Sequence, residues 1–161
     1  MLPLKLKEFL DRHQVKYVVI AHSPAYTAAG IAALTHIPGK ELAKTVIVKV
    51  DGALAMAVVA ASQFVDLEFL KAATGAPTVT LATESEFKDR FPDCEVGAMP
   101  PFGNLYGMTV YAEHDLSKDQ EIAFNAGTHR VLVQMPWVDY EKLVQPKLLP
   151  VAAIKHKAAA A

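Results

Sequence analysis

The stretch Glu41-Leu-Ala-Lys44-Thr-Val-Ile-Val-Lys-Val50 reads as an apolar strand that opens with a lysine. Val46, Val48 and Val50 share one face by the two-residue period of a strand, and counting back by two residues places Lys44 on that face. A lysine at the mouth of an apolar face is either a snorkelling stem with its ammonium in water or a functional amine held in a pocket. The strand alone does not decide between these two roles. If Lys44 is functional, the other residues of its site have to come from elsewhere in the chain.

The segments on either side of this strand alternate between helix and strand patterns. Asp51-Gly52, directly after it, is a two-residue hairpin signal. Thr27, Asp66 and Thr83 stand at positions typical of helix N-caps. Helices are expected over 3–13, 28–35, 67–75, from 84 to about 91, and 137–144, and further strands over 15–20, 54–60, 78–81, 105–112, 121–125 and 130–135.

This order of elements predicts an α+β fold, a single domain with a mixed, mostly antiparallel sheet or small barrel flanked by helices. The domain is expected to span 1–150, because no repeat, charge block or linker offers a place for a second domain to begin. The remainder, 151–161, is expected to be a loose C-terminal tail, since its alanine-rich end has little to pack with.

Composition narrows the class of protein. Hydrophobic residues make up 52% of the 161 residues and charged residues 20%, as in an ordinary globular protein, and the formal net charge of −1 argues against a domain-wide basic surface for nucleic acid. The single cysteine, Cys94, excludes an internal disulfide. The N-terminus lacks the apolar core of a signal peptide, and no charge-free apolar run reaches membrane-spanning length. A cytoplasmic protein without a membrane partner is predicted.

A loop of unusual composition, Gly97-Ala-Met-Pro-Pro-Phe-Gly103, precedes a predicted strand. Prolines fix φ and lack a donor, whereas glycines let the backbone approach a ligand, so such a loop could present rigid amides to an oxyanion or a phosphate. The alternative is a tight loop that only steers the chain into the strand. A second polar turn, Phe124-Asn-Ala-Gly127-Thr-His129, carries a histidine that either acts on a substrate or is merely solvated.

Other chemistries find little support in the sequence. The six histidines show no paired metal-ligand spacing, so neither a metal nor another cofactor is expected. Gly-x-Ser-x-Gly is absent, and Cys94 has no visible base nearby. The glycines also lack dinucleotide or P-loop spacing. Lys44 and the Gly97–Gly103 loop are therefore the remaining candidates for a functional site.

Taken together, three motifs resemble the YbaK family, the editing domain also inserted in bacterial prolyl-tRNA synthetases. They are Leu42-Ala-Lys44-Thr45-Val-Ile-Val, the Gly97–Gly103 loop and Asn125-Ala-Gly127-Thr-His129, and their order and spacing agree from the first helix to about Val144. The resemblance implies a compact α+β domain that hydrolyses mischarged aminoacyl-tRNA, either as an insert or as a free-standing protein acting in trans.

The resemblance also implies site residues. Lys44 matches the lysine that the family requires, and Gly97 with Pro100 or Pro101 matches its Gly-x-x-x-Pro loop, while His129 lies in a motif where some members have no histidine. Catalytic roles are therefore expected for Lys44, Gly97 and His129. Substrate binding is expected from the neighbours of these residues and from the early His-x-x-x-x-Thr segment, namely His22, Thr27, Thr45, Met99, Pro100, Pro101, Phe102, Gly103, Asn125, Gly127 and Thr128.

The implied reaction is attack of water on the ester of a small amino acid carried by a tRNA, with tRNA-Pro as one candidate. Amides of 97–102 would stabilise the carbonyl oxygen as it gains charge, and Lys44 would hold the terminal phosphate or ribose. The expected partner is the acceptor end of aminoacyl-tRNA, with an aminoacyl-tRNA synthetase as a further candidate. Oligomeric state stays open.

Two other functions remain. One is a non-catalytic module of the same fold that senses an amino acid, a nucleotide or another small molecule. The other is a domain that docks on a synthetase, with Trp137 and Tyr140 as a surface anchor, although these aromatics also suit packing of the last helix onto the sheet.

Overall fold

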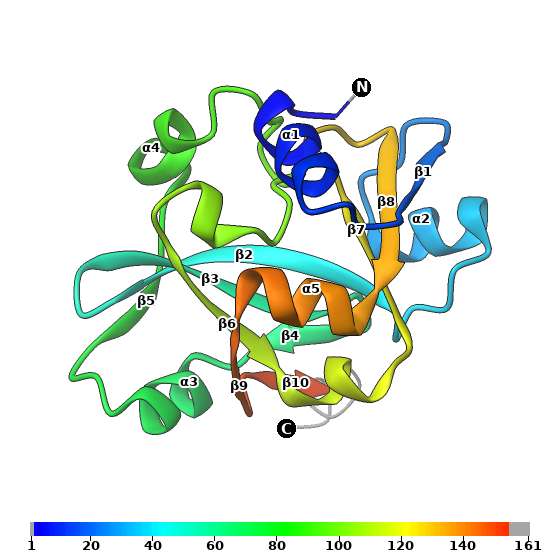
Figure 1. Cartoon of the computed structure of the whole chain (residues 1–161). Coiled ribbons are helices and arrows are strands. Elements are labelled where there is room, and N and C mark those ends of the chain that lie inside the picture. Colours follow the sequence, from blue (N-terminus) through cyan, green and yellow to red (C-terminus); the bar gives the residue numbers. More distant parts are fainter. Residues whose placement is uncertain (1, 155–161) are drawn as a thin grey trace.

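The computed structural model describes residues 2–154, which form a mixed sheet with helices around it (Figure 1). The helices are α1 Leu4–Arg12, α2 Ala28–Thr35, α3 Leu67–Thr74, α4 Glu84–Phe87 and α5 Trp137–Val144. The strands are β1 Val18–Ala21, β2 Leu42–Val50, β3 Ala53–Ala60, β4 Gln63–Val65, β5 Val79–Leu81, β6 Thr109–Glu113, β7 Glu121–Asn125, β8 Val131–Pro136, β9 Lys147–Leu149 and β10 Ala152–Ile154. The predicted α+β class is confirmed.

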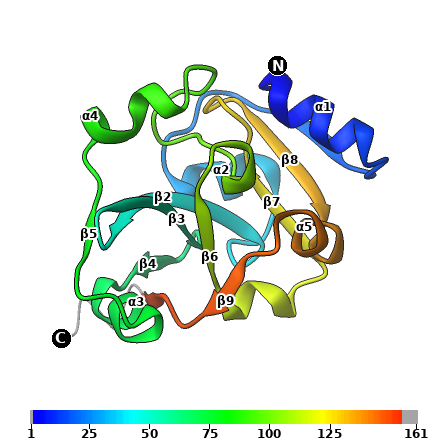
Figure 2. The same cartoon turned by 60° about the vertical axis from the view of Figure 1, so that its left-hand side comes forward.

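The larger sheet has the order β1-β8-β7-β2-β3-β6-β9, with β5 also paired to β2. The pairs β2–β7, β3–β6 and β6–β9 are parallel and the others in this sheet are antiparallel. α1 and α3 lie at opposite ends of the molecule in both views (Figures 1 and 2). The expected mixed, mostly antiparallel sheet is therefore the one observed.

Strand β2, which carries Lys44, lies inside this sheet and separates two apolar clusters. Ala43 and Ile47 on one face belong to the largest core, whereas Val48 on the other face packs with Leu70 of α3. Burial on both faces explains why Val46, Ile47 and Val48 are apolar in succession instead of alternating with polar residues. Lys44 shares the face of Val48, as the two-residue period predicts.

The hairpin between β2 and β3 confirms the strongest local prediction. Asp51 and Gly52 both have positive φ, 50° and 83°, as a two-residue turn of the hairpin type requires, and Val50 pairs with Ala53 across it. Aspartate and glycine tolerate this backbone at low cost, so the dipeptide fixes the register of both strands.

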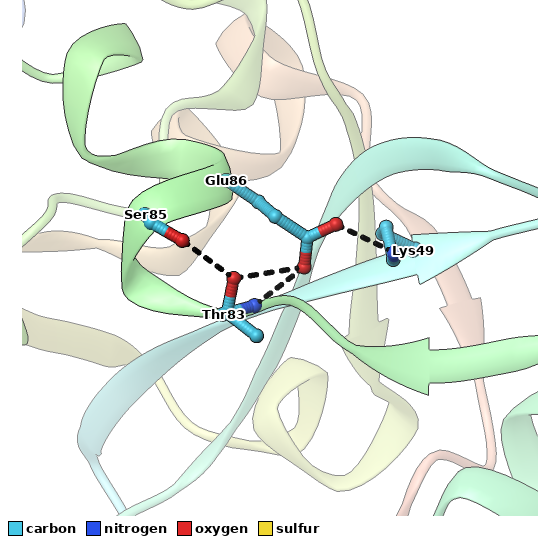
Figure 3. Close-up of polar contacts among 4 residues, drawn as sticks. All are labelled: Lys49, Thr83, Ser85 and Glu86. Carbon is cyan, nitrogen blue, oxygen red and sulfur yellow. Dashed lines mark hydrogen bonds and ion pairs between the residues drawn. The ribbon is translucent and has the colours of Figure 1, made fainter.

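Three helix starts follow the predicted caps. The Thr27 hydroxyl accepts a hydrogen bond from the Gly30 amide at 3.0 Å, and Asp66 accepts from the Phe69 amide at 3.0 Å. At α4, the Thr83 amide donates to Oε1 of Glu86 at 2.8 Å, which completes the capping box (Figure 3).

The same Glu86 ties α4 to β2. Its Oε2 lies 2.6 Å from Nζ of Lys49 (Figure 3). The hydrogen bond from Lys49, followed by those from Thr83, lowers the pKa of Glu86 to about 2. The contact anchors the end of β2 that lies away from Lys44.

The last helix closes the main core. Trp137 and Tyr140 are buried, and the Tyr140 hydroxyl donates to the carbonyl of Pro101 at 2.7 Å. The ring of Tyr140 meets the ring of Phe102 edge-on with centroids 5.4 Å apart. These aromatics pack the helix onto the sheet, and a surface anchor formed by them is ruled out.

The C-terminal boundary differs from the prediction. β9 and β10 were not expected, and Ala152–Ile154 pairs with β4 where a tail from 151 onward was predicted. The buried carboxylate of Glu113 explains the difference, because its Oε1 accepts hydrogen bonds from the amides of Val151 and Ala152 at 3.2 Å each. Residues 155–161 of the predicted tail lie outside the described residues.

Two strand boundaries also move. The predicted strand 105–112 begins only at Thr109, because the Gly103 carbonyl accepts from the amides of Tyr106 and Met108 and holds 103–108 as a turn. The predicted strand 15–20 is shifted to Val18–Ala21. Across 2–154, the structure contains no helix long and apolar enough to cross a membrane.

Candidate active site

A cavity of about 170 Å³ lies where the start of β2 meets the end of β7. The parallel pairing of Leu42 with Ala123 and of Ala43 with Phe124 brings Lys44 and Asn125 to neighbouring positions, because both strands continue in the same direction. The cavity is lined by Tyr26, Ile31, Leu42, Ala43, Lys44, Thr45, Ala61, Gly97 and Asn125. Each of the three motifs that were singled out in the sequence therefore contributes at least one lining residue.

Lys44 is a half-buried residue at this cavity. Its Nζ lies over the ring of Phe64, 5.4 Å from the ring centroid. Phe64 belongs to β4, which follows β3 after a short turn, and β3 is the strand paired with β2. The ammonium is thus placed by tertiary contact as well as by the strand that carries it.

Gly97 has a backbone that only glycine adopts readily, with φ of +88°. A Cβ built at this position would lie 3.3 Å from Cε1 of His129, so a side chain would also crowd the histidine ring. The Gly97 amide donates to Sδ of Met99 at 3.2 Å. A thioether is a weak acceptor, so a stronger acceptor entering the cavity can compete for this amide.

The remainder of the loop differs from the expectation of several free amides aimed at one point. The Ala98 amide donates to Glu95 at 3.0 Å and the Phe102 amide to Pro100 at 2.8 Å, and the two prolines have no amide hydrogen. Met99, Pro100, Pro101, Phe102 and Gly103 are buried and are not among the residues that line the cavity. Phe102 packs among the buried aromatic rings of the core, so this part of the loop anchors Gly97 to the core.

The third motif also has one residue that lines the cavity and others that do not. Asn125 lines the cavity, and its Oδ1 is buried without a hydrogen-bond partner. Gly127 lies deeper, where its amide donates to the Ala98 carbonyl at 2.8 Å and its α-carbon faces Pro3. The Thr128 hydroxyl accepts from the Arg130 amide at 3.2 Å. Gly127 and Thr128 therefore shape the turn and join it to the Gly97 loop.

His129 lies beside the cavity, next to two of its lining residues. Its ring packs on Tyr26 with centroids 4.7 Å apart, and Nε2 lies 3.0 Å from the Val96 carbonyl oxygen. Because a carbonyl only accepts, Nε2 is the donor in this contact. Nδ1 is buried without a partner. This geometry makes the histidine a bridge between Tyr26 and the Gly97 loop.

His22 and Thr27 of the early segment are not among the lining residues. Thr27 caps α2, and His22 Nδ1 donates to the Ser23 carbonyl at 2.7 Å, which leaves a buried Nε2 without a partner. Tyr26, between them, does line the cavity and is 74% exposed, so it forms part of the rim. Tyr26, which the sequence analysis did not name, is thus the residue of this segment that lines the cavity.

Other lining residues missed from the sequence are apolar: Ile31, Leu42, Ala43 and Ala61. Their pattern is that of core residues, so no sequence signal separates them from the core.

Neither metal nor thiol chemistry is indicated by the described residues. No group of three or more histidine, cysteine, aspartate or glutamate residues in 2–154 is placed to hold a metal ion. Burial raises the pKa of Cys94 to about 12, so this side chain is a protonated thiol near neutral pH.

Comparisons with known proteins identify the family of this chain. Residues 22–143 match the profile of the aminoacyl-tRNA editing domain. Over 150 residues the chain is 28% identical to the multifunctional Ser/Thr-tRNA deacylase ProXp-y of Escherichia coli (strain K12), with 90% of this chain and 89% of that protein covered.

Solved structures share the fold. The hypothetical protein APE2540 superposes with a TM-score of 0.82 at 20% identity, covering 92% of this chain and 99% of that one. A structure described as a candidate trans-editing enzyme for prolyl tRNA synthetase gives a TM-score of 0.79 at 19% identity, covering 92% and 95%. Because the editing-domain profile spans most of the chain, this protein belongs to the aminoacyl-tRNA editing domain family, the YbaK family of aminoacyl-tRNA deacylases.

Proposed function

We propose that this chain acts in trans as an editing deacylase, which hydrolyses the ester of a small amino acid on a mischarged tRNA. The observation that carries the proposal is the convergence of Lys44, Gly97 and Asn125 on one cavity. At about 170 Å³ the cavity is below the range of roughly 300–1,000 Å³ typical of whole-ligand pockets, so it suits the aminoacyl group and leaves the nucleotide outside.

Lys44 contributes position and charge. Its ammonium holds the terminal phosphate or a ribose oxygen, which brings the ester to the cavity mouth. Tyr26 on the rim offers an exposed aromatic face next to this position. With a net charge of −1, the protein is expected to bind tRNA weakly and with a marked dependence on salt.

Gly97 supplies the hydrogen bond that matters most for the reaction. As water attacks the carbonyl carbon, the carbonyl oxygen gains negative charge. The Gly97 amide then donates its hydrogen bond to this oxygen instead of to the Met99 sulfur. The C–O bond to the ribose then breaks, and the ribose oxygen leaves with a proton that the water provides. The products are the free amino acid and a tRNA with its terminal hydroxyl restored.

His129 is proposed as a positioning residue for this step. Its ring contacts Tyr26, and its Nε2–H holds the carbonyl of Val96, directly before Gly97. The ring thereby fixes the backbone whose amide faces the ester.

The amino acid is proposed from a short set. Alanine, cysteine, serine and threonine are small enough for the cavity, and the Escherichia coli relative is named for serine and threonine. A small cavity excludes larger side chains by size, which is a stronger selection than the affinity gained from one methylene.

The test is deacylation of a panel of mischarged tRNAs by the wild type, by Lys44→Ala and by Lys16→Ala. Lys16 is exposed on the segment before β1 and serves as the matched control for loss of one lysine charge. Activity that Lys44→Ala loses and Lys16→Ala keeps supports the enzyme. Equal rates for all three would remove Lys44 from the mechanism, and a wild type inactive on every tRNA would favour the ligand-sensing module.

A further inference from the structure

A buried carboxylate holds the C-terminal segment that contains β9 and β10. Glu113 ends β6 with 6% of its surface exposed, and its Oε1 accepts hydrogen bonds from the amides of Val151 and Ala152 at 3.2 Å each. Its Oε2 accepts from the Asp115 amide at 2.9 Å. An ionised carboxylate suits this position, because all of its hydrogen-bonding atoms are acceptors and the three groups that face it are donors.

The segment that Glu113 holds in turn supports β4. Strands β4 and β10 form a two-stranded sheet of their own, in which Ala153 lies opposite Phe64 (Figure 1). Directly after β4, the Asp66 amide donates to the carbonyl of the fully buried Val151 at 2.7 Å. The C-terminal segment therefore contacts the backbone of β4 along the strand and just beyond its end.

Phe64 connects β4 with the candidate active site. Nζ of Lys44 lies over the Phe64 ring, 5.4 Å from its centroid, and Lys44 lines the cavity. Because Phe64 is 41% exposed, its side chain gains only part of the free energy of full burial, and the place of the ring depends on how its backbone is held. β4 is only three residues long, so its pairing with β10 is a large part of that support.

We propose that Glu113 is a positioning residue for the active site, which acts through β10 and Phe64 on the ammonium of Lys44. Residues 147–154 thus help to place the lysine although they are not among the residues that line the cavity. The expected effect on rate rests on the proposed deacylase function, whereas the expected effect on the Lys44–Phe64 contact does not depend on any reaction.

The cation–ring contact limits the size of the effect. A ring at an exposed site that attracts a cation predicts a loss of about twofold to fivefold in kcat/KM when the ring is displaced. A change at Glu113 that acts through Phe64 can cost no more than this. It also has nothing further to remove once the ring itself is absent, so the two changes are expected to be non-additive.

The experiment is a double-mutant cycle on deacylation in the full chain. Glu113→Gln and Ala153→Pro are each made in the wild type and in Phe64→Leu. Glutamine cannot accept from all three amides, and proline lacks an amide hydrogen and disfavours a strand at β10 without changing Glu113. Glu86→Gln is the matched control, because Glu86 also accepts from a backbone amide, that of Thr83, but joins α4 to β2 at Lys49.

Glu113→Gln and Ala153→Pro are each expected to lower kcat/KM by about twofold to fivefold in the wild type and to leave it unchanged in Phe64→Leu. Glu86→Gln is expected to change neither background. Circular dichroism checks that each variant is folded. Equal losses in the two backgrounds would mean a merely structural role and overturn the inference, and so would full activity of both variants.

A second readout needs no substrate and separates this inference from the proposed reaction. The ring current of Phe64 shifts the ε-methylene protons of Lys44 upfield, and NMR measures this shift in each protein. The shift is expected in the wild type and in Glu86→Gln, and is expected to shrink in Glu113→Gln and Ala153→Pro.

The two proposals can fail separately. If the protein hydrolyses no ester but the shift shrinks as expected, the deacylase proposal fails while the positioning role of Glu113 stands. A wild type without the upfield shift overturns the inference without any variant, and so does a shift that Glu113→Gln and Ala153→Pro both leave unchanged.

Discussion

The ammonium of Lys44 lies 5.4 Å from the centre of the Phe64 ring, and the two residues come from strands that are not paired with each other. A cation over an aromatic face at this separation is attracted by the ring. Phe64 is 41% exposed and is not among the residues that line the cavity. The contact gives Lys44 a preferred direction that the strand cannot supply.

Replacing Phe64 with leucine is expected to lower kcat/KM for deacylation about twofold to fivefold, because the ring contributes about 0.5–1 kcal/mol at an exposed site. Phe64→Tyr keeps the aromatic face and is expected to retain activity. Phe69→Leu, which removes an exposed ring on α3, is the control. Equal rates for Phe64→Leu and Phe64→Tyr would show that the ring does not position Lys44.

Gly97→Ala is expected to abolish most of the activity and to cost about 1–2 kcal/mol of stability, because φ is +88° and the new Cβ would lie 3.3 Å from the His129 ring. The measurements are deacylation and urea unfolding. Gly39→Ala is the matched control, since a Cβ there meets no atom within 4 Å. Full activity of Gly97→Ala would contradict the role given to the Gly97 amide.

Tyr140→Phe is expected to destabilise the protein by about 1–3 kcal/mol, because the carbonyl of Pro101 would lose its buried donor. Burial raises the pKa of Tyr140, so the hydroxyl stays protonated and keeps donating well into the alkaline range. Urea unfolding measures the change. Tyr17→Phe, whose hydroxyl donates to Asp11 at a more exposed position, should cost less, and an equal cost would argue against burial as the reason.

The ion pair of Glu86 with Lys49 is expected to make stability depend on acid pH. Hydrogen bonds from Lys49 and then Thr83 lower the pKa of Glu86 from 4.5 to about 2, so the folded state favours the carboxylate. The resulting stabilisation is present above pH 4.5 and is lost as the pH falls from there through about 2.

Thermal unfolding of the wild type and of Glu86→Gln as a function of pH tests this dependence. The wild type should have the higher Tm near neutral pH, and the difference should shrink between pH 4.5 and about 2. Glu84→Gln, in the same first turn of α4, controls for loss of one helix-start charge. A difference in Tm that does not change with pH would refute the assignment.

Several elements could be predicted from the sequence because the residues that specify them are neighbours in the chain. The predicted helices over 28–35 and 137–144 have the observed bounds, and so does the strand over 121–125. β4, β9 and β10 were missed, since each is three residues long and is held by pairing with a distant strand. Periodicity is weak in segments this short, and among the three-residue strands of 2–154 only β5 was predicted from the sequence.

The candidate site was only partly predictable. Lys44, Thr45, Gly97 and Asn125 were named from the sequence and line the cavity, but Met99, Phe102 and Gly103 from the same motifs lie in the core. A motif marks a segment, whereas burial of each residue within it depends on what packs against that segment. For Phe102, packing against α1, α5 and the surrounding aromatic side chains buries the ring.

By itself, the sequence determined the local turns, the helix caps and the strand that carries Lys44, since these depend on backbone preferences and hydrogen bonds within a few residues. Tertiary structure decided which groups meet. The parallel pairing of β2 with β7 brings Asn125 beside Lys44, and packing of Phe64 directs the ammonium. Contacts of this kind depend on the burial of apolar surface shared by distant segments, and no single stretch of the chain contains that information.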